Sequence, residues 1–215
     1  MKNKQWDIRQ LRESQPETAR IKLRWILASG LSGLVLGFLA AHLEPLVDSG
    51  GALPAFLSWL NELFSRLGIW VFTALLLSIF CKSSAAAIRN AGLFFSGRLL
   101  GYVLYGLILS GTFSGNFLLL GLLSILVGPA WALLAWYGKG EGFPSLLLAS
   151  LSTGLLLQQS IGISLAFFSF KHIEELVLFA LLLLAYRRPA KQALILCGVS
   201  IVVAFFLEHL DFLSA

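Results

Sequence analysis

Arg98 is the only charged residue that lies well inside a predicted membrane span, so it is the first candidate for a functional role. An ionisable group within the hydrocarbon layer is costly and by default indicates a function. On a helix, Tyr102 and Tyr105 share a face with Arg98, where their rings could flank the guanidinium or accept its hydrogen bonds. The pattern predicts a contact with an anion, a lipid headgroup or a substrate. The alternative is a side chain that snorkels to the headgroups about two turns away.

A second polar group is the adjacent pair Gln158 and Gln159, in a run that carries far more serine than its neighbours. Successive residues on a helix diverge by about 100°, so the two amides cannot both face one neighbouring helix. Hydrogen bonding between helices, worth about 0.6 kcal/mol per pair, explains such polarity. The alternative is a polar substrate path towards the run of Arg98. The candidate binding centre comprises Arg98, Tyr102, Tyr105, Gln158 and Gln159.

Histidines and carboxylates at the predicted span ends could hold a divalent metal or take part in proton-linked chemistry. The metal hypothesis rests on His172, Glu175 and His209. No histidine lies four residues from another, so no pair has the helical spacing of metal ligands. Capping of span ends by amphipathic side chains is the alternative interpretation, and no cofactor is expected.

A further motif pair lies in the last fifth of the chain, where Glu174 and Glu175 precede an FxxxH motif that runs from Phe205 to His209. These residues resemble the first two motifs of the intramembrane CAAX-type prenyl-protease family, whose glutamates and histidines surround a water between helices. The resemblance implies a membrane-embedded hydrolase. Phe179 stands where that family's EExxxR motif has arginine, and no phosphate loop, CxxC, HExxH or GxSxG motif occurs. A non-enzymatic protein is therefore the favoured prediction.

Small residues at four-residue spacing predict two helix-packing faces. One face consists of Gly33, Gly37 and Ala41, and the other consists of Gly97 and Gly101. Such faces allow helix backbones to approach closely. Packing within the chain and pairing with a second copy or another membrane subunit both follow from this spacing.

The elements that position these residues are membrane helices. The chain has 215 residues, of which 58% are hydrophobic and 13% charged, and its mean hydropathy is +0.85. An average soluble domain has about 25% charged residues, so a lipid bilayer is the expected surrounding of this chain. The net charge of +5 is divided among short clusters between apolar runs, which predicts orientation in a membrane and no nucleic-acid partner.

The fold class predicted is all-α, a transmembrane helix bundle of about seven spans that follows a cytoplasmic basic tail at 1–24. The single transmembrane domain covers 25–207, and 208–215 form a short outer tail. An amphipathic helix at Pro54–Phe64 is expected to be interfacial, re-entrant or an extension of the second span. Thirteen of the 16 Lys and Arg residues fall on one side if the N-terminus is inside and the C-terminus outside. The spans are Trp25–His42, Leu67–Cys81, Ala91–Ser110, Phe117–Tyr137, Pro144–Phe168, Ile173–Tyr186 and Gln192–Leu207.

Tryptophans at the predicted span ends suggest an aromatic belt at the headgroup level. They are Trp25, Trp59, Trp70 and Trp136, and Tyr137 belongs to the same predicted belt.

Three stretches carry a second resemblance: AIRNAGLFFSGRLLGYVLYG (Ala87–Gly106), GPAWALLAWYGKG (Gly128–Gly140) and HIEELVLFALLLLAYRR from His172. In their order, the chain resembles a group of uncharacterised bacterial small multi-spanning membrane proteins, which implies a multi-pass protein of the bacterial cytoplasmic membrane. We expect a non-enzymatic carrier component that binds a small solute or lipid. The alternatives are a scaffold or partner subunit that acts through small-residue faces, and a membrane-embedded hydrolase or metal-site protein.

Overall fold

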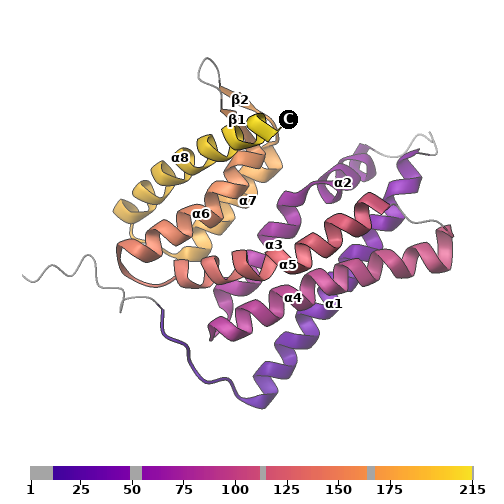
Figure 1. Ribbon diagram of the computed structural model, residues 1–215, viewed down its shortest axis with the longest axis horizontal. Helices are drawn as coiled ribbons and strands as arrows, with labels where there is room; N and C mark the ends of the chain where they lie inside the picture. Colours follow the sequence, from indigo (N-terminus) through magenta and orange to yellow (C-terminus); the bar gives the residue numbers. More distant parts are fainter. Residues whose placement is uncertain (1–11, 49–54, 112–114, 164–167, 215) are drawn as a thin grey trace, which may run out of the picture.

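The computed structural model describes residues 12–48, 55–111, 115–163 and 168–214, which form a helical bundle with one short β-hairpin (Figure 1). The predicted all-helical class is confirmed at this level. The elements are α1 (Ala19–Asp48), α2 (Ala55–Ser65), α3 (Leu67–Phe80), α4 (Ser84–Tyr105), the π-helix η3 (Gly106–Ser110), α5 (Gly115–Gly138), α6 (Gly142–Ser160), β1 (Ile161–Ile163), β2 (Phe168–Phe170), α7 (Ile173–Tyr186) and α8 (Ala190–Ser214).

Several helices have the length and composition of membrane spans. Among the described residues, four qualify: Ala19–Leu43, Ser84–Leu109, Phe117–Gly138 and Ala190–His209. The helices α2 and α3 meet at a 66° bend and make a fifth candidate if they count as one broken span. The helix α7 has 14 residues; at 1.5 Å per residue it covers about 21 Å of a hydrocarbon layer of about 30 Å.

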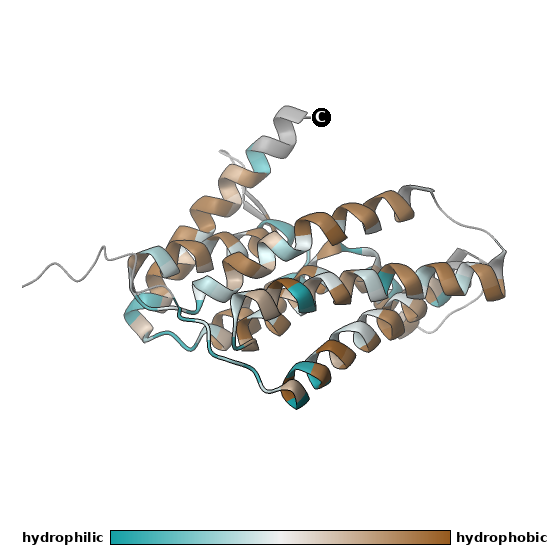
Figure 2. Cartoon of the chain, turned by 60° about the horizontal axis from the view of Figure 1, so that its bottom comes forward, coloured by the Kyte–Doolittle hydropathy of each residue, from teal (hydrophilic) through white to brown (hydrophobic). Residues whose placement is uncertain are grey.

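The long helices leave apolar faces uncovered, as lipid contact requires. Figure 2 shows hydrophobic residues along most of these helices and hydrophilic residues at several helix ends and in the N-terminal segment. The exposed stripe on α1 repeats every four residues, so it forms one face of the helix. Its members, Leu23, Leu27, Leu31, Val35 and Leu39, are 44–58% exposed.

The helix α3 packs against several other helices of the bundle. The helix α1 packs chiefly against α4, and α5 packs against both α4 and α6 (Figure 1). The helix α3 contacts α4 and α5 as well as α7, while α8 packs on α6. One helix, α3, therefore contacts both α4 and α7.

The predicted small-residue faces lie in the contact between α1 and α4. A Cβ atom added to Gly37 would overlap the backbone carbonyl of Arg98. A Cβ atom added to any of three other glycines would overlap a different backbone carbonyl of the facing helix. Both faces are thus occupied within the chain, so neither offers a free surface to another subunit. The overlapping pairs are Gly33 with Phe94, Gly37 with Arg98, Gly97 with Gly30 and Gly101 with Leu34.

The predicted span Pro144–Phe168 is wrong at its end, because α6 stops at Ser160 and the chain turns into the hairpin. The carbonyl of Ser160 accepts hydrogen bonds from the backbone N–H groups of Lys171 and His172, at 2.9 and 3.2 Å. Two β-branched isoleucines around a glycine form β1, a composition that favours extended backbone over helix. Hydropathy does not distinguish such a strand from a helix.

Other helices extend beyond their predicted ends. The helix α1 begins at Ala19 and α8 continues to Ser214. The helix α4 begins at Ser84, where the predicted span began at Ala91. Its N-cap is Ser83, whose hydroxyl accepts a 3.2 Å hydrogen bond from the N–H of Ala86. The amphipathic helix predicted at Pro54–Phe64 is observed as α2, although Pro54 itself lies outside the described residues.

The predicted aromatic belt is wrong for two tryptophans. Trp70 is 1% exposed and Trp136 is 0% exposed, so neither ring lies on the surface. Their indole N–H groups donate to the carbonyls of Phe64 (2.8 Å) and Cys81 (3.0 Å), respectively. A buried indole needs such a partner, and here a neighbouring segment provides it in place of a lipid headgroup.

The N-terminal segment is attached to the end of α3 through Arg12. Its guanidinium donates to the carbonyls of Ile79 (2.9 Å) and Cys81 (2.6 Å) and lies 4.9 Å from the ring centroid of Trp136. The last carbonyls of a helix have no partner within the helix and carry partial negative charge, so a cation is favoured there.

Replacing Arg12 by alanine is expected to release this segment from the bundle. The change removes two charge-assisted hydrogen bonds, each worth about 1.5–3 kcal/mol. Hydrogen exchange of the amides of 12–18 should become faster in Arg12→Ala. Arg24→Ala is the matched control, because Arg24 is exposed on α1. Equal exchange in both variants would contradict the assigned contact.

Candidate functional site

Arg98 lies in the middle of the candidate span Ser84–Leu109. At 1.5 Å per residue it is about 21 Å from Ser84 and about 16 Å from Leu109. The side chain is 6% exposed, so it is enclosed by the protein and does not extend along the surface to a headgroup. Snorkelling towards the start of the helix, the alternative considered from the sequence, does not describe this geometry.

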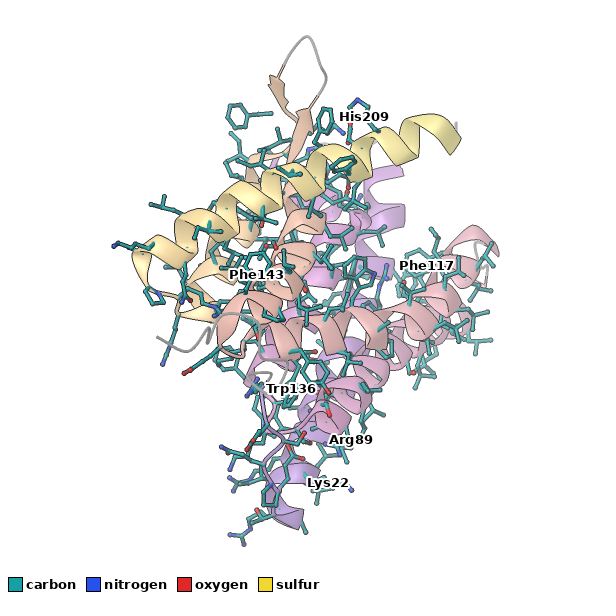
Figure 3. The ribbon with its side chains drawn as sticks, turned by 60° about the vertical axis from the view of Figure 1, so that its left-hand side comes forward. Lys22, Arg89, Phe117, Trp136, Phe143 and His209 are labelled. Carbon is teal, nitrogen blue, oxygen red and sulfur yellow. The ribbon has the colours of Figure 1, made fainter. Side chains whose placement is uncertain are left out.

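Two aromatic rings from different helices enclose the guanidinium. Its central carbon lies 4.1 Å from the ring centroid of Trp70 on α3 and 5.1 Å from that of Phe117 on α5. In Figure 3, Phe117 lies well away from Lys22 and Arg89, which gather towards the end of the bundle near the N-terminal segment. Each cation–π contact is worth about 0.5–2 kcal/mol, more where water is excluded. Three helices thus fix the position of one charge.

The predicted tyrosines extend this aromatic frame. Tyr102 stacks on Phe117 with centroids 3.8 Å apart and an interplanar angle of 20°. Tyr105 contacts Phe38 and His42 edge-on, with centroid distances of 5.5 and 5.6 Å. The structure therefore places Tyr102 next to a ring that covers Arg98, and Tyr105 one layer further along α4.

Two of the three guanidinium nitrogens of Arg98 have no hydrogen-bond partner among the described residues. Within the described part of the chain, Nε and Nη1 are buried and have no hydrogen-bond acceptor, and the four ion pairs there involve other arginines and lysines. A buried charged donor without an acceptor costs more than a neutral one, because the group has lost its water. Aromatic faces offset part of that cost, but they accept no conventional hydrogen bond. The described residues therefore provide no acceptor for these two nitrogens of a fixed cation.

The glutamines form a separate cluster with Glu208 and Lys171. The amide of Gln158, 8% exposed, donates to Glu208 at 3.2 Å, and Lys171 donates to the same carboxylate at 2.6 Å. Gln159 donates to the amide oxygen of Gln158 at 3.2 Å. These contacts join α6 and α8 with the segment after β2, whereas Arg98 contacts α3 and α5. No described interaction brings the glutamines to Arg98, so the five residues predicted as one centre fall into two clusters.

The residues of the metal hypothesis do not form a ligand set. The ring of His209 packs on Phe205 at 4.1 Å and its Nδ1 lies 2.9 Å from the carbonyl of that residue. His172 is the N-cap residue of α7, and Glu175 is completely buried in the first turn of that helix. In the parts of the chain that the structure describes, no three His, Cys, Asp or Glu side chains are arranged to hold a metal ion.

The adjacent glutamates of α7 point in different directions. Glu174 accepts a 2.7 Å hydrogen bond from the indole of Trp59 and a 3.3 Å hydrogen bond from Arg66, which also pairs with Glu62. Glu175 faces Gly68 at the start of α3, and a Cβ on that glycine would overlap its carboxylate. Neighbours on a helix diverge, so the pair does not converge on one water as the protease resemblance implied.

Sequence reasoning missed the residues that enclose the site. Trp70 was assigned to the headgroup belt, and Phe117 was taken only as the start of a span. Both rings come from other helices, and their contact with Arg98 depends on the rotation of each helix in the bundle. The residue pattern of a single span does not show how that helix is rotated about its axis in the bundle. The matching depth of Trp70 and Arg98 in neighbouring antiparallel spans is the one clue that could have suggested the contact.

Comparison of the chain with protein-family models, with curated proteins and with solved structures finds no match. The resemblance to bacterial multi-spanning proteins remains a prediction from pattern alone. The geometry around Arg98 is therefore the basis for a functional assignment.

Proposed function

We propose that this integral membrane protein is a non-enzymatic carrier component that binds an anionic group at Arg98. The observation that carries the proposal is the enclosed guanidinium, with two buried nitrogens that lack an acceptor. Arginine remains charged in proteins and prefers carboxylate and phosphate partners. A ligand with such a group would supply the acceptor that the described residues do not. The phosphate of a lipid and a small anionic solute share this chemistry.

The frame of rings suits a transient ligand better than a permanent structural ion pair. A carboxylate from the chain would neutralise Arg98 in every state of the protein. Aromatic faces stabilise the cation only in part and leave its edge donors available to an incoming anion. The residual 6% exposure places the side chain just below the protein surface, so a small displacement of a covering ring such as Phe117 would open it.

For the topology we propose seven crossings in a bacterial cytoplasmic membrane, with the N-terminus inside. The ends of α3 and α5 meet where Trp136 contacts Cys81, and Arg188, after α7, reaches Gly138 at the end of α5. These contacts support a common end for the three helices. Basic residues concentrate at that end, as expected for the cytoplasmic side. They are Lys82, Lys139, Arg187, Arg188 and Lys191.

Native mass spectrometry of the full chain, released from mild detergent, tests the binding proposal. The wild type should carry a stoichiometric adduct that is lost in Arg98→Met, a substitution that removes a buried charge and keeps an apolar side chain of similar length. The matched control is Arg89→Met, on the same helix but paired with Glu17 at 3.3 Å. A phospholipid mass indicates a headgroup ligand, and a small anion mass indicates a solute.

Two results would overturn the assignment. One is an adduct that persists unchanged in Arg98→Met. The other is a wild-type protein that binds nothing when it is supplied in turn with phosphatidylglycerol and with sulfate. Thermal unfolding of the same samples shows whether the variants are folded.

A further inference from the structure

Glu175 is a second buried charge without a partner, and the anion site does not use it. The residue is 0% exposed, and neither carboxylate oxygen has a hydrogen-bond partner in the described part of the chain. It lies in the first turn of α7 and packs against the backbone of Gly68. A carboxylate removed from water without donors is strongly disfavoured, whereas a protonated carboxyl is neutral at the same place.

The first turn of α3 separates Glu175 from Arg98. Gly68 contacts Glu175, and Trp70 contacts the guanidinium of Arg98. Positions two apart on a helix point about 200° apart, so these residues face opposite sides of α3. One helical turn thus contacts both Glu175 and Arg98.

The charges around Glu175 are few. Arg66 and Glu174 act on it, and Arg66 is already shared between Glu62 and Glu174. The helices α3 and α6 pack against α7 and contain no titratable side chain. The helix α2 reaches α7 through the hydrogen bond of Trp59 to Glu174, and its titratable residue is Glu62. His172 is the N-cap residue of α7, and Lys171, which precedes it, pairs with Glu208. Nothing in this set neutralises Glu175 completely.

We propose that Glu175 is a proton-binding site linked to the anion site at Arg98 through the first turn of α3, an inference that rests on the proposed function. Its carboxylate takes one proton from the aqueous phase and becomes a neutral carboxyl. An ionised Glu175 repels an anion on the far side of the turn through a medium of low dielectric constant. Protonation removes that repulsion, so proton and anion each favour the binding of the other. Binding of both together is the behaviour expected of a proton-coupled anion carrier.

Calorimetric binding to the purified full chain between pH 5 and pH 9 tests the linkage. The probes are sulfate and a short-chain phosphatidylglycerol, because the charge of each is constant over this range. For the probe that binds, the wild-type Kd should fall by about fivefold or more from pH 9 to pH 5, the size of a typical coupling between sites. Glu175→Gln should bind tightly at every pH. Glu174→Gln, which changes the neighbouring carboxylate, should keep the pH dependence.

The outcomes separate this proposal from the proposed function. Wild-type binding that is independent of pH, or a pH dependence that persists in Glu175→Gln, overturns the linkage and leaves the anion site in place. Absence of binding at every pH overturns the anion site and the linkage with it. If Glu175→Gln does not fold, proton uptake by the wild type decides: uptake on addition of the bound probe in weak buffer supports the linkage, and none overturns it.

Discussion

Replacing Gly37 by alanine is expected to lower the free energy of unfolding by about 3 kcal/mol, the upper part of the range for an overpacked contact. The added methyl group would overlap the backbone carbonyl of Arg98. A backbone carbonyl cannot move aside as the end of a flexible side chain can, so α1 and α4 must separate. Separation weakens the neighbouring contacts of Gly33, Gly97 and Gly101 as well, because all of them join the same two helices.

The measurement is thermal unfolding in detergent, where a loss of this size corresponds to about 6–12 °C for a chain of this length. Gly30→Ala is the matched control on the same helix, because a Cβ there meets nothing within 4 Å. Alanine also favours helix over glycine by about 0.5–1 kcal/mol, so the control should be neutral or slightly stabilised. Equal melting temperatures for the two variants would contradict close contact between α1 and α4.

Gly37→Ala should also weaken anion binding, since it displaces the backbone that carries the guanidinium. This second readout connects the packing face with the site. The sequence predicted the two separately: a small-residue face from its spacing, and a binding residue from its charge. Gly37 packs on the backbone carbonyl of Arg98 because of the way α1 and α4 are aligned along their axes. Neither the glycine spacing nor the position of the charge specifies that alignment.

The apolar runs and glycine spacing were sufficient to predict the helical class and the faces at the α1–α4 contact. They were insufficient at helix ends. A polar stretch such as the one around Ser83 was not predicted to begin a helix, and an apolar strand such as Ile161–Ile163 was predicted to continue one. The beginning of α4 matters most, because the earlier start at Ser84 moves Arg98 from about two turns inside the predicted span to the middle of the helix. Depth changes the interpretation of the residue from a headgroup contact to an enclosed charge.

The candidate site shows the same division. Arg98 could be identified from the sequence because it is a charged residue within an apolar run. The free-energy cost of placing a charge in a membrane span depends on that position alone. Gln158 and Gln159 were joined to it on polarity alone, and the structure instead pairs them with Glu208 and Lys171. Long polar side chains take the partner that the tertiary fold brings within reach. Glu175 was identified by residue type for a metal site, yet its burial without donors is a feature of the folded chain alone.

Replacing Trp70 by alanine should lower the free energy of unfolding by about 4 kcal/mol, within the range for a buried tryptophan. The ring is 1% exposed and packs among residues of α1, α3 and α4, so its removal leaves a cavity where three helices meet. Thermal unfolding should show a loss of about 8–16 °C. Trp59→Ala is the matched control, since that ring is 40% exposed, and it should cost far less.

The same variant tests how the site holds its charge. The cavity left by Trp70 borders the guanidinium, so water can enter and accept hydrogen bonds from Arg98 where an aromatic face stood. Hydrated Arg98 would bind an anion more weakly, because water must first be displaced. Trp70→Phe keeps an aromatic face but loses the indole N–H bonded to Phe64, so it separates ring stacking from that hydrogen bond.

A double-mutant cycle of Trp70→Ala with Arg98→Met isolates the contact between the two residues. The coupling free energy is expected to be about 1–2 kcal/mol, the range for a desolvated cation–π pair. Additive effects would show that the indole and the guanidinium do not interact in the folded protein. In that case the ring would only fill space, and the low-dielectric frame that we assign to the anion site would lose one of its two walls.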